Sequence, residues 1–368
     1  MYLIIVPVII PYFMNLGLSM TEIFIIQGMF GFSMALFEVP SAYLGDIWGR
    51  KKILLLGTFI SGASFTLLVY ATNFWSLLLY EVILAIGASF VSGADLAIMY
   101  DSLGEDRAAK IRSVSNFHGM QLLGESAAAL TCSFFMHYSY KHVVWSQFVV
   151  GWFPFIIALF LIEPKIERMI KGQHRKNLGE VFHHIFMDDL KMRLIFMNMV
   201  TWSVSTFCAI WIIQKYWQDQ NIPLYNLGIL WAICNITAAI TGKIAPKLEI
   251  IFGAKKLLIC MSLLPVVAYI TMGLYPGLVG IVMTLSFYVS RGLNMVIMKE
   301  AFNHRIPDKF RNTANSLNSL CFRMTFFVLG PIIGIIIDNY GMGSALQFLG
   351  GLFSIFFIAL MLPLLRKL

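Results

Sequence analysis

Five ionisable residues lie inside stretches of sequence that are otherwise almost entirely apolar. They are the acids Glu38, Asp95 and Glu125 and the bases Arg291 and Arg323. If these stretches cross a membrane, each charge costs at least about 2.5 kcal/mol near the bilayer centre. Charges kept in such places indicate a function, so these five residues are the first candidates for a proton-coupling or solute-binding site.

Three of the five, Glu125, Arg323 and Arg291, fall near the middle of their segments and allow three interpretations. Glu125 could bind and release a proton as its hydration changes. It could instead form a structural or gating ion pair with one of the arginines, which would satisfy both charges. The arginines could also contact a solute directly. An anionic or zwitterionic solute would suit that role, because a guanidinium binds carboxylate or phosphate in a bidentate manner.

Glu38 and Asp95 lie close to the ends of their segments and are weaker candidates for coupling. Hydrogen-bonded helix packing, beside Pro40 and Gly93, is the alternative interpretation for both. Glu81 lies toward the opposite end of its segment, where we expect it to reach the membrane boundary.

The stretch SAYLGDIWGRKK, residues 41–52, concentrates charge and glycine between two apolar segments. Asp46 could sit at the positive N-terminus of another helix, an interaction of about 0.3–1 kcal/mol when exposed. Gly49 allows the chain to turn tightly. Lys51 and Lys52 are also expected to meet anionic lipid and so to set the topology, a role that is the alternative interpretation for Arg50.

The elements that carry these residues follow from composition. Hydrophobic residues make up 59% of the 368 residues and charged residues only 12%, which excludes an ordinary soluble domain. Because backbone polar groups must be satisfied within lipid, apolar segments of about 20 residues are expected to be helices. The sequence therefore predicts an all-α membrane protein with twelve transmembrane helices, at residues 2–17, 22–44, 52–71, 75–100, 112–136, 142–162, 191–216, 223–247, 255–273, 276–299, 312–337 and 343–365.

The 27 Lys and Arg residues lie almost entirely on one side of these helices, the side that holds the GRKK loop. Only Lys141 and Lys215 fall on the other side. Because positive loops face the cytoplasm, both termini are expected to be cytoplasmic, in a multi-pass protein of a bacterial inner membrane. The first segment lacks the basic front and cleavage site of a signal peptide. We expect it to be a retained span, with the natural chain beginning slightly upstream of Met1.

Several functional classes are not expected. The net charge of +8 reflects the loop asymmetry and does not indicate a nucleic-acid partner. The five cysteines lie in apolar segments without the spacing of metal ligands. The chain also lacks a P-loop, a nucleotide fingerprint or a catalytic constellation. We therefore expect neither a metal, a cofactor nor enzymatic activity.

The two halves of the chain resemble each other. Aligning residues 92–116 with residues 291–315, without a gap, matches charged and amide residues as well as apolar ones: Met99 with Met298, Asp101 with Glu300, Arg112 with Arg311 and Asn116 with Asn315. Two six-helix bundles of the same orientation are therefore predicted, at residues 1–162 and 191–368. Residues 163–190 form a cytoplasmic linker with an amphipathic segment.

The stretch AYLGDIWGRKK resembles the signature loop between helices 2 and 3 of the major facilitator superfamily. The two predicted halves of six helices each fit that family over the whole chain. The resemblance implies that Asp46 contacts helix 11 and that Arg50 pairs with Asp101 at the end of helix 4. These contacts would form a latch when the cytoplasmic side is closed. Solute would bind at mid-depth between the halves.

The resemblance, with the charges inside the spans, predicts a secondary active transporter of a small organic solute that works by alternating access. Proton coupling is expected, since without an ATP-binding motif uphill transport must use an ion gradient. Export of a metabolite, siderophore-like compound or drug is favoured narrowly over uptake. A non-transporting membrane receptor or assembly partner is the alternative from another class. The expected partners are the solute, protons and the lipid bilayer, with the chain acting as a monomer.

Overall fold

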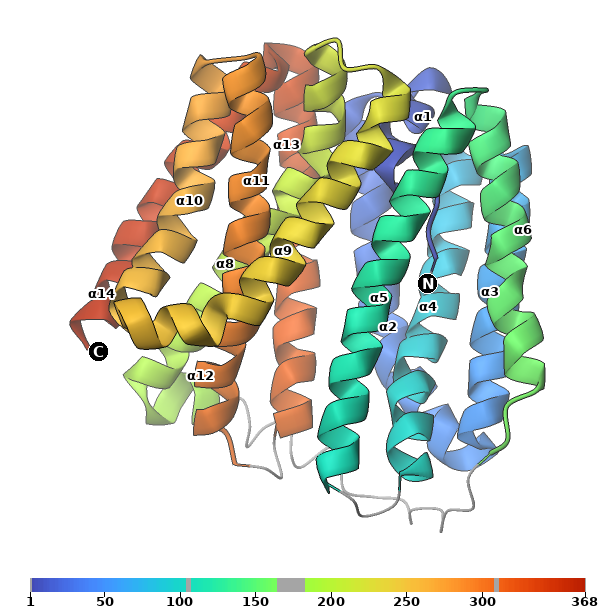
Figure 1. Ribbon diagram of the computed structural model, residues 1–368, viewed down its shortest axis with the longest axis horizontal. Helices are drawn as coiled ribbons and strands as arrows, with labels where there is room; N and C mark the ends of the chain where they lie inside the picture. Colours follow the sequence, from blue (N-terminus) through green and yellow to red (C-terminus); the bar gives the residue numbers. More distant parts are fainter. Residues whose placement is uncertain (1, 104–106, 164–182, 308–310, 368) are drawn as a thin grey trace. The chain divides into compact units, whose positions relative to one another are not determined.

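The computed structural model describes residues 2–103, 107–163, 183–307 and 311–367. Nearly all of these residues are helical, and none of them lies in a β-strand. The long helices run alongside one another within each of two compact units (Figure 1).

The first unit contains the helices up to residue 163 together with the first turns of a later helix, residues 223–232. Its helices are η1 (Val6–Val8), α1 (Ile9–Asn15), α2 (Met20–Trp48), α3 (Arg50–Tyr70), α4 (Phe74–Ser102), α5 (Arg107–Met136) and α6 (Tyr140–Leu159).

The second unit contains the remaining described residues. Its helices are η2 (His184–Asp188), α8 (Leu190–Asp219), the rest of α9 (Leu224–Phe252), α10 (Ala254–Leu274), α11 (Leu278–Leu293), η3 (Asn294–Met298), α12 (Lys299–Arg305), α13 (Arg311–Phe356), η5 (Phe357–Met361) and α14 (Leu362–Arg366). The predicted bundle boundaries, 1–162 and 191–368, stay a prediction. Most of the predicted linker lies outside the described residues.

The predicted membrane spans correspond to helices in the structure. Nine helices among the described residues are long and apolar enough to cross a membrane. One of these, Thr313–Arg366, includes two predicted spans, which meet at the kink where Gly341 has a φ of 83°. Two shorter apolar helices, Val6–Asn15 and Leu123–Met136, account for the other two predicted spans. The all-α membrane fold is therefore confirmed.

The first predicted span is shorter in the structure than in the sequence-based assignment. Residues 2–5 are not helical, and regular helix begins at Val6. The side-chain oxygen of Gln147 on α6 accepts hydrogen bonds from the backbone N–H groups of Ile4, at 2.6 Å, and Ile5, at 3.3 Å. These bonds hold the segment against α6, because they satisfy donors that precede the first helical turn.

Helices α3 and α4 pack with their backbones close together. A Cβ atom added to Gly57 would lie 2.9 Å from the carbonyl oxygen of Gly87, and one added to Gly87 would lie 2.8 Å from the backbone nitrogen of Ser61. Small residues at such crossings permit the close helix approach that stabilises membrane bundles. The α3 and α4 pair therefore has no room for larger side chains at this point.

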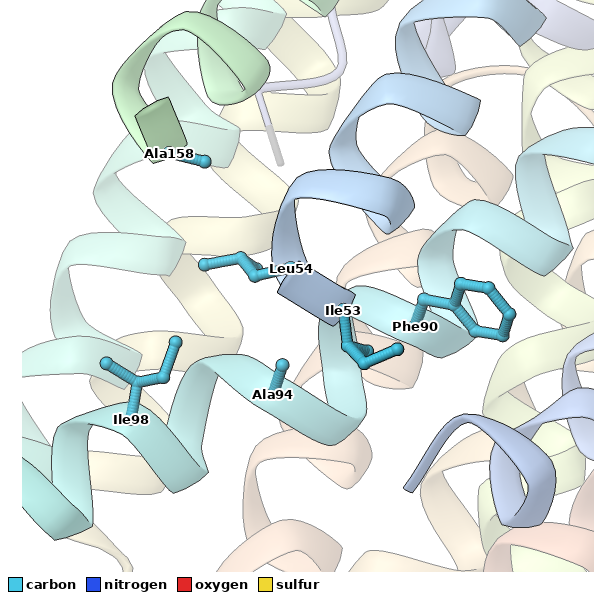
Figure 2. Packing of buried hydrophobic residues seen from close by; sticks show 6 residues of the cluster. All are labelled: Ile53, Leu54, Phe90, Ala94, Ile98 and Ala158. Carbon is cyan, nitrogen blue, oxygen red and sulfur yellow. The ribbon is translucent and has the colours of Figure 1, made fainter. Parts of the chain in front are cut away.

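A buried cluster joins α3, α4 and α6 at the end of α3 that follows the GRKK loop. Figure 2 shows its members, which come from all three helices: Ile53, Leu54, Phe90, Ala94, Ile98 and Ala158. Close packing of these side chains fixes the position of the first turns of α3. The cluster therefore holds the loop in place against α4 and α6.

Candidate functional site

The most deeply buried of the charged side chains inside the spans is one that the sequence placed at a boundary. Glu81 on α4 is only 3% exposed, and Nε2 of Gln27 on α2 donates a hydrogen bond to its Oε1 at 2.9 Å. The expected position of Glu81 near the membrane boundary stays a prediction, but its carboxyl does not face solvent, because α2 packs over this face of α4 and encloses it. In the sequence, the amide residue Gln27 inside an apolar segment was the one feature that could have indicated a buried partner for Glu81.

Glu125 on α5 is partly buried. Nε2 of Gln121, one turn earlier on the same helix, donates a hydrogen bond to its Oε1 at 3.1 Å. Its hydrogen-bond partner among the described residues is therefore a neutral amide of its own helix, and the carboxyl is more accessible than that of Glu81. The predicted pairing with Arg323 or Arg291 would join the two units and stays a prediction.

The two arginines of the second unit are both partly buried. Nε of Arg323 on α13 donates to Oγ of Ser319 at 3.2 Å. Arg291 lies in the last turn of α11, directly before the π-helical turn η3. At the start of that turn, Nδ2 of Asn294 donates to Oγ of Ser203 on α8 at 2.9 Å. Because π-turns inside helices often mark functional sites, this segment supports Arg291 as a candidate.

Glu38 on α2 and Asp95 on α4 are also partly buried. Beside Glu38, Oγ of the fully buried Ser41 donates to the Glu38 carbonyl oxygen at 2.9 Å and to the Ser89 carbonyl oxygen of α4 at 3.0 Å. This shared hydroxyl joins the two helices. Helix packing is therefore a sufficient explanation for the polar residues around Glu38.

The signature loop packs against the end of α6. Gly49 separates α2 from α3 with a φ of 99°, and the Glu163 carboxylate occupies the space that a side chain at position 49 would need. Nζ of Lys51 donates to the carbonyl oxygen of Leu159, the last residue of α6, at 3.1 Å. A cation at a helix C-terminus is stabilising. Lys51 therefore has a structural partner in addition to its predicted topological role.

Two acids of the predicted latch, Asp46 and Asp101, have side chains outside the part that the structure describes. Arg50 is partly buried at the first position of α3. The predicted contact between Arg50 and Asp101 stays a prediction. The loop contacts Glu163 and Leu159, which lie more than a hundred residues later in the sequence. The sequence of the motif did not predict these contacts.

Replacing Gly49 with Ala is expected to lower the thermal unfolding temperature. The φ of 99° costs a residue with a Cβ about 1–3 kcal/mol, and the exposed Glu163 carboxylate must also move aside to admit the added atom. Gly253→Ala is the matched control, since its φ is 80° but nothing lies within 4 Å of the added atom. An unchanged unfolding temperature in Gly49→Ala would contradict the assigned backbone conformation. A loss larger than that of Gly253→Ala, and reduced by Glu163→Ala, would measure the contribution of the Glu163 contact.

The profile of the Major Facilitator Superfamily matches residues 1–304. The chain belongs to this superfamily. The signature loop and the five functional candidates from Glu38 to Arg323 therefore belong to a member of a family of membrane transporters.

Proteins of similar sequence are also described as transporters. The chain is 26% identical over 168 residues to an uncharacterized transporter of Buchnera aphidicola, a match that covers 43% of this chain and 41% of that protein. It is 22% identical over 352 residues to the uncharacterized MFS-type transporter YxaM of Bacillus subtilis, covering 92% of this chain and 86% of that protein.

Solved structures of other transporters share the fold. The nucleoside transporter NupG superposes with a TM-score of 0.76 at 12% identity, covering 100% of this chain and 94% of that one. A bacterial homolog of the human lysosomal transporter Spinster, solved inward-facing and unoccupied, superposes with a TM-score of 0.77 at 16% identity, covering 99% and 93%. The superfamily fold therefore extends over the whole chain.

Proposed function

We propose that this chain is a proton-coupled secondary transporter that exports a small organic solute by alternating access. The observation that carries the proposal is the superfamily match over residues 1–304 together with acids inside the spans. Such residues are retained in membranes for coupling or binding. The protein would lie in a bacterial inner membrane with both termini in the cytoplasm and exchange protons for solute as an antiporter.

Glu125 is the proposed coupling acid. Its carboxyl is partly buried, and its described hydrogen-bond donor is the uncharged amide of Gln121. A carboxyl with a neutral partner can gain or lose a proton without leaving a second charge unpaired. It can therefore alternate between two protonation states as the surroundings of α5 change.

The proposed solute is anionic or zwitterionic. Arg291 and Arg323 are partly buried cations of the second unit, on α11 and α13. A guanidinium presents paired N–H donors that match a carboxylate or phosphate. Two such groups favour a metabolite, siderophore-like compound or drug that carries an acidic group.

Thermal unfolding of the purified protein against a panel of anionic, zwitterionic and cationic solutes tests the proposal. We expect an anionic or zwitterionic solute to raise the unfolding temperature, and Arg291→Gln or Arg323→Gln to remove that rise. Arg305→Gln is the matched control, an exposed arginine at the end of α12. A rise caused by cations and lost in Glu125→Gln would contradict the assignment. Stable capture of a protein partner without any solute effect would favour a receptor.

A further inference from the structure

Glu81 is enclosed by neighbouring helices of the first unit. It lies seven residues after the start of α4, which is about 10 Å along a helix that rises 1.5 Å per residue. Leu77, Leu84 and Ala85, on the same helix, are buried as well. The carboxyl therefore belongs to a buried face of α4 within the first unit.

The groups around this carboxyl are neutral. Gln27 approaches from α2, and its amide nitrogen donates to Oε1 of Glu81 at 2.9 Å. The titratable neighbour is the phenol of Tyr80 on α4, which is 1% exposed. Tyr80 in turn lies near Tyr12 of α1, and Phe65 of α3 packs on it. Among the described residues, no cation is hydrogen-bonded to or paired with Glu81.

This environment suits a carboxylic acid and not a carboxylate. An ionised carboxylate is strongly destabilised away from water unless a cation pairs with it. An amide N–H supplies one hydrogen bond but no compensating charge. A protonated carboxyl is in addition a donor, and it can return a hydrogen bond to the amide oxygen of Gln27. Gln27 is therefore placed to hold the protonated form.

We propose that Glu81 is an exchangeable proton-binding site of this transporter, distinct from Glu125, in which Gln27 holds the proton-loaded carboxyl between α2 and α4. The proposal rests on the proton coupling proposed above. It assigns the two acids different positions, since Glu125 is partly exposed on α5 while Glu81 is enclosed. Proton exchange at Glu81 requires the contact between α2 and α4 to admit water for part of the time.

Infrared spectroscopy of the purified protein in lipid nanodiscs tests the proposal without a known solute. A protonated carboxyl has a carbonyl-stretching band that an ionised carboxylate lacks. We expect a band at neutral pH that is lost in Glu81→Gln and kept in Glu125→Gln. Glu81→Gln has nearly the same shape and retains a polar partner for Gln27, so the variant should fold. In Gln27→Leu the band should move, because the carboxyl loses its hydrogen bond.

Proton exchange with the solvent distinguishes a proton-binding site from a permanently protonated Glu81 that only forms a structural hydrogen bond with Gln27. The band should shift when the solvent is replaced by heavy water, and it should disappear as the pH is raised. A difference spectrum without a Glu81 band at neutral pH would overturn the proposal, and so would a band that neither exchanges nor titrates. Failure of the proposed function has another signature. In that case the rate of solute flux would not depend on an imposed pH gradient, while the infrared band of Glu81 would still change with pH.

Discussion

Replacing Glu125 with Gln is expected to abolish solute accumulation driven by a pH gradient while leaving solute exchange intact. Glutamine keeps the size of the side chain and can still bond to Gln121, but it cannot bind or release a proton. Without that step, movement of solute is no longer linked to movement of a proton. Accumulation should fall to the level of downhill equilibration.

The measurement is paired flux in proteoliposomes, with a solute identified by thermal stabilisation. Uphill accumulation is measured under an imposed pH gradient, and exchange is measured with labelled solute on both sides. Glu249→Gln, at a partly buried acid near the end of α9, is the control and should behave as the unmodified protein. Normal uphill accumulation in Glu125→Gln would exclude this residue as the coupling acid. If inward proton movement drives solute inward, in the same direction as the protons, the protein is an uptake symporter and not an exporter.

Replacing Gly87 with Leu is expected to destabilise the first unit strongly. Any Cβ at this position meets the backbone of α3, at Ser61 N and Gly57 O, and backbone atoms cannot rotate away as a flexible side chain does. Overpacking a tight core costs about 1–3 kcal/mol or more. Separation of α3 from α4 would also loosen the cluster that holds the signature loop.

Fluorescence-detected size-exclusion chromatography after heating measures this effect, with Gly351→Leu as the matched control. Gly351 also lies within a helix of a membrane span, but nothing is within 4 Å of its added Cβ. The Gly87→Leu protein should lose its monodisperse peak at a much lower temperature than the control. Equal behaviour of the two variants would show that the α3 and α4 backbones are not in contact at this glycine.

The sequence by itself determined the class of the protein and its repeated helices. An apolar run of about 20 residues must become a helix in lipid whatever surrounds it, because its backbone groups have no other partners. The turn at Gly49 and the family signature around it are equally local. For that reason the all-α fold and the superfamily could be predicted, and the structure and the family match confirm them.

Only the tertiary structure decided which polar residues are enclosed and what they touch. In lipid, both the membrane-facing and the protein-facing sides of a helix are apolar, so the sequence pattern does not mark the buried side. The sequence therefore did not reveal that the Glu81 carboxyl is enclosed, which became evident only from the packing of α2 and the hydrogen bond from Gln27. The contact of Lys51 with Leu159 joins segments 108 residues apart, and such a contact depends on how α3 and α6 pack.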